Sequence, residues 1–205
     1  MEISMRKTLA AIALLATAGL TLAACGDDSM DRMEHGADPS ASTSPTPSGD
    51  VAGDFNDADV TFASDMIPHH RQALEMAELA ETRAEAVEVK DLAEKIKGAQ
   101  DPEIELMSGW LTAWGEPVPE AMGAHDMNGS MPGMMSSEDM DALMVASGAD
   151  FDQMFLTMMI EHHQGAVEMS QTENSDGSNP EAIALAEQIE SAQTEEIATM
   201  EALLQ

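Results

Sequence analysis

Two copies of one short motif combine methionine with paired histidines. The pattern Met-Ile-x-His-His, with another methionine six residues after the second histidine, occurs at Met66, His69, His70 and Met76 and again at Met159, His162, His163 and Met169. On a helix, residues three and four positions apart share a face, so a thioether and an imidazole can converge on one ion. The two copies together offer up to four imidazoles, and we interpret these eight residues as candidate metal ligands.

A second group of soft donors lies between the two motifs. A Gly/Pro/Met-rich loop over about residues 115–136 carries Met122, His125, Met127, Met131, Met134 and Met135. We include these six residues among the candidate ligands. Met30, Met33 and His35, nearer the amino end, add donors of the same kind.

The type of donor indicates the type of metal. Cys25 is the only cysteine, so no thiolate is available within the helical region and no disulfide can form within the chain. Thioether and imidazole ligands suit Cu(I), Cu(II) and Ag(I), and suit zinc, calcium or magnesium poorly. Methionine also stays available outside the cytoplasm, where thiols become oxidised. The pattern therefore predicts copper, with silver as a second metal that the same donors suit.

Methionine at helical spacing has a simpler explanation, because it is more often a pliable core residue than a ligand. The chain has 19 Met against 4 Phe, 2 Trp and no Tyr, and the loop methionines lie where no core is expected. A lone buried histidine is also commonly structural. A doubled histidine that recurs beside methionine on two helices favours the metal interpretation.

The chain repeats itself at a fixed offset of 93 residues. Beyond the motifs, Leu92, Ala93, Glu94, Ile96, Ala99, Gln100, Ile104, Met107 and Leu111 recur as Leu185, Ala186, Glu187, Ile189, Ala192, Gln193, Ile197, Met200 and Leu204. Each repeat, over about 59–111 and 152–204, contains two helix-patterned segments and cannot cover its own apolar face. We therefore predict an all-α fold in which two helical hairpins form a four-helix bundle over 55–205.

Apolar residues and histidines step by three or four from Phe62 to Ala80, which is the period of a helix. Pro68 and Pro102 each remove an intrahelical hydrogen bond, so a kink is plausible at both. Ser137-Glu138-Asp139 predicts the start of a short additional helix.

The amino end has the order of a secretory signal. Arg6 and Lys7 precede an apolar run over residues 9–22, and Leu-Ala-Ala-Cys ends at Cys25. Met5, in place of Met1, is an alternative translation start. We predict a signal peptide over 1–24, lipidation of Cys25 at what resembles a lipobox, and a polar tether over 25–54 that lifts the domain off the outer face of the cell membrane. An ordinary signal peptide and an uncleaved anchor helix are the alternatives.

The formal net charge is −31, from 39 acidic and 8 basic side chains. Such a field repels nucleic acid and concentrates cations, so nucleic-acid binding is excluded. Solubility or a salty habitat explains the acidity as readily as a role in metal binding.

The doubled motif resembles the domain-of-unknown-function 305 family. The resemblance rests on Phe-x-x-x-Met-Ile-x-His-His-x-x-Ala-x-Glu-Met, at 62–76 and 155–169, with the Met-rich loop between, and it covers about 54–205. It implies a ferritin-like four-helix bundle, commonly on an exported lipoprotein, with copper bound by some members outside the cytoplasm. It also implies copper binding at the eight motif residues. A copper-trafficking protein is the protein partner that we expect.

Two other functions compete with copper sequestration, buffering or transfer. A di-iron oxidase would need Glu-x-x-His on two helices, and the sequence has no such spacing. No hydrolase triad, phosphate loop or dinucleotide fingerprint occurs either, so we predict no enzyme activity. A non-metal envelope interaction protein would explain the acidity and the tether, but not the repeated histidine pairs.

Overall fold

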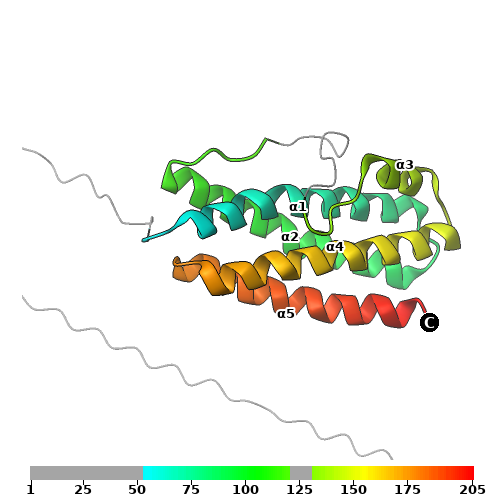
Figure 1. Cartoon of the computed structure of the whole chain (residues 1–205). Helices are drawn as coiled ribbons and strands as arrows, with labels where there is room; N and C mark the ends of the chain where they lie inside the picture. Colours follow the sequence, from blue (N-terminus) through cyan, green and yellow to red (C-terminus); the bar gives the residue numbers. More distant parts are fainter. Residues whose placement is uncertain (1–52, 121–130) are drawn as a thin grey trace, which may run out of the picture. The chain divides into compact units, whose positions relative to one another are not determined.

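The computed structural model describes residues 53–120 and 131–205, which form five helices and no strand. They are α1 (Asp57–Arg83), α2 (Val87–Trp114), α3 (Ser137–Val145), α4 (Ala149–Asp176) and α5 (Pro180–Leu203) (Figure 1). The predicted all-α class is confirmed. The signal segment, Cys25, nearly all of the tether, Met122, His125 and Met127 lie outside the described residues.

Each sequence repeat folds as a hairpin, α1 with α2 and α4 with α5, and the hairpins pack through α1 and α4. Figure 1 shows these four long helices side by side, with α3 beside the end of α1 and the start of α4. The predicted pairing of the two histidine-bearing helices is therefore confirmed. The ferritin-like arrangement of the bundle stays a prediction.

Local capping explains where helices begin. Asn56 and Asp59 form a capping box at the start of α1, and Ser136 and Asp139 form one at α3, which begins at the predicted Ser137. Helices α1 and α2 continue through Pro68 and Pro102. Tertiary packing over long helices offsets the hydrogen bond that each proline removes.

Two repeat-related aspartates connect the hairpins reciprocally. Asp59, near the start of α1, accepts hydrogen bonds from the backbone N–H groups of Ser178 and Asn179, at 3.1 and 2.8 Å, in the turn after α4. Asp152, near the start of α4, accepts from Glu85 and Ala86, at 3.0 and 2.8 Å, in the turn after α1. Helices α1 and α4 are therefore antiparallel, and the hairpins are related by an approximate two-fold axis.

Apolar side chains gather in two clusters along the α1/α4 interface. The first cluster includes Ala73, Met76, Phe155 and Met159, and the second includes Phe62, Met66, Trp110 and Ala166. Each cluster thus joins the early part of one helix to the later part of the other, as antiparallel packing requires. The histidines fall between the two clusters.

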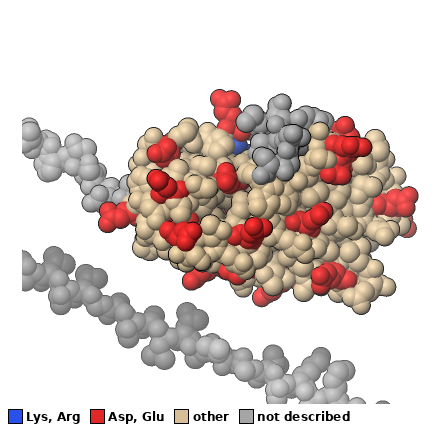
Figure 2. Space-filling model, in the orientation of Figure 1, with Lys and Arg blue, Asp and Glu red and all other residues tan. Residues whose placement is uncertain are grey.

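Acidic side chains are spread over the surface of the helical domain, as Figure 2 shows for one face. Within residues 53–120 and 131–205, no helix has the length and apolar character needed to cross a membrane.

Candidate metal centre

The four motif histidines lie at the α1/α4 interface and are fully buried: His69, His70, His162 and His163 each have 0% exposure. The rings of His69 and His162 have centroids 3.7 Å apart and are tilted by 36°, and the rings of His162 and His163 have centroids 6.4 Å apart. The fold therefore brings together side chains 93 residues apart in the sequence.

Two glutamates from the outer helices contact the second histidine of each pair. The Nε2 atom of His70 lies 2.7 Å from Oε2 of Glu103 on α2, and the Nε2 atom of His163 lies 2.7 Å from Oε2 of Glu196 on α5. An ionised carboxylate only accepts, so a neutral imidazole must donate its N–H from Nε2. Sequence reasoning missed both glutamates, although Glu196 stands 93 residues after Glu103.

The Nδ1 atoms of all four histidines are buried and have no hydrogen-bond partner among the described residues. His162 Nε2 has none either. Buried polar atoms in proteins are nearly always paired, and a neutral imidazole nitrogen without a proton is a good metal ligand. The free nitrogen lone pairs at the centre therefore fit a metal ion.

Burial also determines the charge of the central rings. Burial, with the nearby His70 and His163, lowers the pKa of His69 to about 3, although the hydrogen bond to Pro132 opposes this. Burial and the neighbouring histidines hold the pKa of His162 well below its ordinary value of 6.5. Both rings are neutral at pH 7, which is the form that binds metals.

A short segment, residues 131–136, covers the histidines, and we call it the strap. The carbonyl oxygen of Pro132 accepts a hydrogen bond from His69 Nε2, at 3.2 Å. The side chain of Gln72 donates to the carbonyl oxygen of Met135, at 3.0 Å, and accepts from its N–H, at 2.7 Å. The strap is thus attached to α1 through both the N–H and the C=O of Met135.

The strap contacts α4 at Gly165, which occupies the position equivalent to Gln72 in the second repeat. A Cβ atom at Gly165 would overlap the Pro132 carbonyl and approach Gly133 Cα within 2.8 Å. Gly133 itself has a φ of 73°, in the left-handed region that favours glycine. The two repeats therefore differ where the strap crosses them.

The candidate methionines are mostly buried. Met66, Met76 and Met159 are fully buried in the two clusters, and Met169 is half-buried against the second. Met134 and Met135 are buried, and Met131 is half-buried. The expectation of no core around the loop methionines is wrong for Met135, which joins the first cluster because the strap folds back over α1 and α4.

Nitrogen and oxygen donors alone do not complete a site in the part of the chain that the structure describes. There, no three His, Cys, Asp or Glu side chains converge closely enough to hold a metal ion. Zinc needs about four such ligands, whereas a soft monovalent ion is satisfied by fewer donors that include thioethers. The donor set thus fits copper or silver better than zinc.

A family model for a domain of unknown function, DUF305, matches residues 59–204. The chain belongs to the DUF305 family. This confirms the resemblance drawn from the repeated motif. No curated protein matches this DUF305 protein.

Several solved DUF305 structures are similar to it. A fragment from Deinococcus radiodurans is 33% identical, with a TM-score of 0.66, over 74% of this chain and 98% of that one. A protein from Streptomyces coelicolor, assigned as secreted, is 33% identical, with a TM-score of 0.65, over 72% and 91%. CopM in its Cu(II)-bound form is 37% identical, with a TM-score of 0.63, over 71% and 95%, and CopM has also been solved with Cu(I) and with silver.

Proposed function

We propose that this DUF305 protein binds copper outside the cytoplasm, as Cu(I) or Cu(II), and sequesters, buffers or transfers it without catalysis. We propose that it also binds silver, as Ag(I). The observation that carries the proposal is the approach of the His69 and His162 rings, with centroids 3.7 Å apart, together with buried Nδ1 atoms on all four motif histidines that have no hydrogen-bond partner in the described part of the chain. The similarity to CopM, solved with Cu(II), Cu(I) and silver, supports it.

Charge and surface shape support an approach route for the ion. A cavity of about 440 Å³ next to the strap is lined by Met131, Met134 and Met135 and by the carboxylates of Asp139, Glu161 and Glu168. The acidic surface raises the local concentration of cations. The methionine thioethers in the cavity wall then favour soft metal ions over the more abundant hard metal ions.

The proposed location is the outer face of the cell membrane, with lipid on Cys25. The leader pattern of the sequence supports export, and so does the secreted assignment of the Streptomyces coelicolor relative. A copper-trafficking protein is the proposed partner. In cells, Cys25→Ser should release the protein from the membrane fraction or leave an uncleaved precursor. A variant of mature size that stays with the membrane would contradict lipidation.

Metal titration tests the function directly. The mature chain, with Cys25→Ser, is titrated with Cu(I) under a competing chelator, and separately with Cu(II) and Ag(I). Replacing His69, His70, His162 and His163 by Ala should abolish Cu(II) binding and weaken Cu(I) binding, because imidazole is the donor that both ions share. Full Cu(II) binding by this variant would show that the motif has been misassigned.

The strap and loop methionines are tested by a volume-conserving variant. Replacing Met122, Met127, Met131, Met134 and Met135 by Leu removes the thioethers and keeps the apolar volume. The stoichiometry of Cu(I) and Ag(I) should fall while the circular dichroism of the helices is unchanged. Unchanged Cu(I) binding would show that these methionines only pack. No binding of any metal by the parent would favour an envelope interaction protein.

A further inference from the structure

We propose that Glu103 and Glu196 are positioning residues of the copper site. Each holds one histidine in the tautomer that presents Nδ1 to the metal, and the negative charge of each favours Cu(II) over Cu(I). This inference rests on the proposed function and assigns a role to the outer helices α2 and α5, which carry none of the motif histidines.

The two contacts have the same geometry. Each joins Nε2 of a fully buried histidine to a glutamate oxygen at 2.7 Å, and each glutamate stands 33 residues after its histidine. The side chains of Glu103 and Glu196 are 21% and 23% exposed, so each carboxylate contacts both solvent and a buried ring. Two exposed glutamates on the same helices lack such a repeat, since Glu105 corresponds to Ala198 and Glu195 to Pro102.

The tautomer decides which nitrogen can coordinate. A neutral imidazole has one N–H and one lone pair. When Nε2–H donates to the carboxylate, the lone pair lies on Nδ1, and in both histidines that atom is buried and has no partner within residues 53–120 and 131–205. Without the carboxylate, either nitrogen could carry the proton, and part of the population would direct an N–H at the metal. Carboxylates hydrogen-bonded to metal-binding histidines act in this way in other proteins.

The negative charge of the two carboxylates should affect the affinity for Cu(II) more than the affinity for Cu(I). Coulomb attraction to a fixed negative charge is twice as large for a divalent ion as for a monovalent one at the same distance. Two partly buried carboxylates, one on each side of the approximate two-fold axis, should therefore strengthen Cu(II) binding more than Cu(I) or Ag(I) binding.

The tautomer is measured first, on the metal-free mature chain, by long-range ¹⁵N–¹H NMR of the histidine rings. In the parent, His70 and His163 should carry the proton on Nε2. The variant Glu103→Leu/Glu196→Leu removes both acceptors and should lose this preference. A proton on Nδ1 in the parent, or an unchanged tautomer in the Leu variant with the helical fold intact, would overturn the positioning role.

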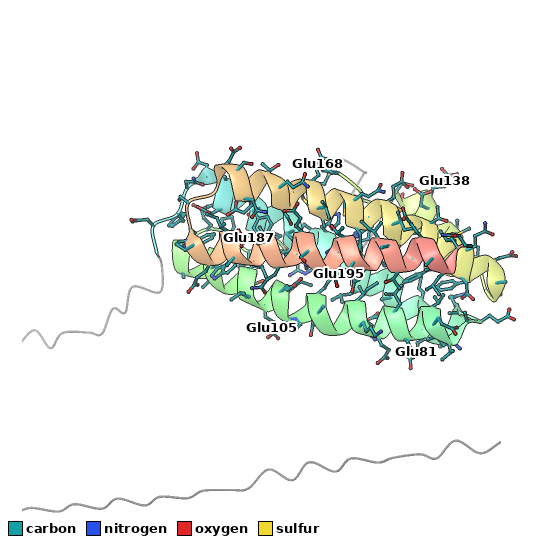
Figure 3. All side chains as sticks on the ribbon, turned by 90° about the horizontal axis from the view of Figure 1, so that it is seen from below. Glu81, Glu105, Glu138, Glu168, Glu187 and Glu195 are labelled. Atoms are coloured by element: carbon teal, nitrogen blue, oxygen red, sulfur yellow. The ribbon has the colours of Figure 1, made fainter. Side chains whose placement is uncertain are left out.

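The charge effect is measured with Glu103→Gln/Glu196→Gln, which keeps a side chain of the same shape and removes both charges. Its affinity for Cu(II) should fall by roughly 10–100-fold, the usual effect of losing such a partner, and its affinity for Ag(I) should fall much less. The matched control is Glu105→Gln/Glu195→Gln, at exposed positions on the same two helices (Figure 3).

Equal losses for Cu(II) and Ag(I), or the same Cu(II) loss in the control, would overturn the charge effect. Failure of the proposed function is a separate outcome. If the parent binds no copper, the proposed function is wrong, while the NMR measurement on the metal-free chain still decides whether the two glutamates fix the tautomers.

Discussion

Burial determines protonation at two places in this molecule, with opposite consequences for stability. The imidazoles of His69 and His162 are neutral because water is excluded from the α1/α4 interface. Burial and the neighbouring Asp59 raise the pKa of Glu173, on α4, to about 8, so its carboxyl stays protonated at neutral pH. Backbone N–H groups, led by that of Asn179, lower the pKa of Asp59 despite its burial.

The histidines should make the metal-free protein acid-sensitive. Below pH 6.5 the unfolded chain takes up protons at positions 69 and 162, while the folded chain does so only well below that pH. Stability therefore falls as pH falls, by up to about 1.4 kcal/mol per pH unit for each ring. Urea unfolding between pH 7 and 5 should show this slope, and His69→Gln/His162→Gln should flatten it. An equal slope in the variant would contradict the prediction.

Glu173 should make the free energy of unfolding depend on pH in the opposite direction. Its folded pKa lies above the ordinary 4.5, so its contribution to stability is fully present below pH 4.5 and is lost as pH rises through about 8. Glu173→Gln keeps the shape and cannot ionise, so above pH 8 it should be more stable than the parent by about 1 kcal/mol or more. Thermal unfolding at pH 5 and 9 measures the difference, and a variant less stable at pH 9 would contradict the assignment.

At the scale of elements, the helices were predictable and the strap was not. The 93-residue offset and the steps of three and four determine the hairpins and bring the histidine pairs together, because a repeat must bury its apolar stripe against its copy. The contacts from Glu103 and Glu196 to the histidines join different helices, and no local period marks them. The one visible signal for the strap was the mismatch between Gln72 and Gly165 in otherwise equivalent positions.

Gly165→Ala should detach the strap. The added methyl group would occupy the position of the Pro132 carbonyl, so backbone must move, at a cost of about 1–3 kcal/mol. The amide of Met135, now bonded to Gln72, should exchange with deuterium faster. Gly109→Ala, on α2, is the control, because no atom of the described residues lies within 4 Å of an added Cβ and alanine favours a helix. Unchanged exchange at Met135 in Gly165→Ala would contradict this contact.

At the scale of the whole molecule, two reciprocal carboxylates fasten each hairpin to the other's turn. Asp152→Ala would leave the N–H groups of Glu85 and Ala86 without their acceptor, and should cost about 1–3 kcal/mol in urea unfolding. Asp150→Ala, at an exposed position in the first turn of the same helix, removes the same charge. A comparable loss in both variants would point to a charge effect of the helix end instead of the contact between hairpins.

The ring contact between His69 and His162 has a mechanical consequence. A copper ion held by both rings would be a removable cross-link that closes a loop of 93 residues. By the chain-entropy estimate for covalent bridges, such a closure restricts the unfolded chain by on the order of 4–5 kcal/mol. Among the described residues the two hairpins contact each other mainly through α1 and α4, and the ion would link them at this contact, so the copper-loaded hairpins should separate more slowly. A protein that accepts the copper must therefore compete with the α1/α4 interface. Release of the ion then requires the two hairpins to separate.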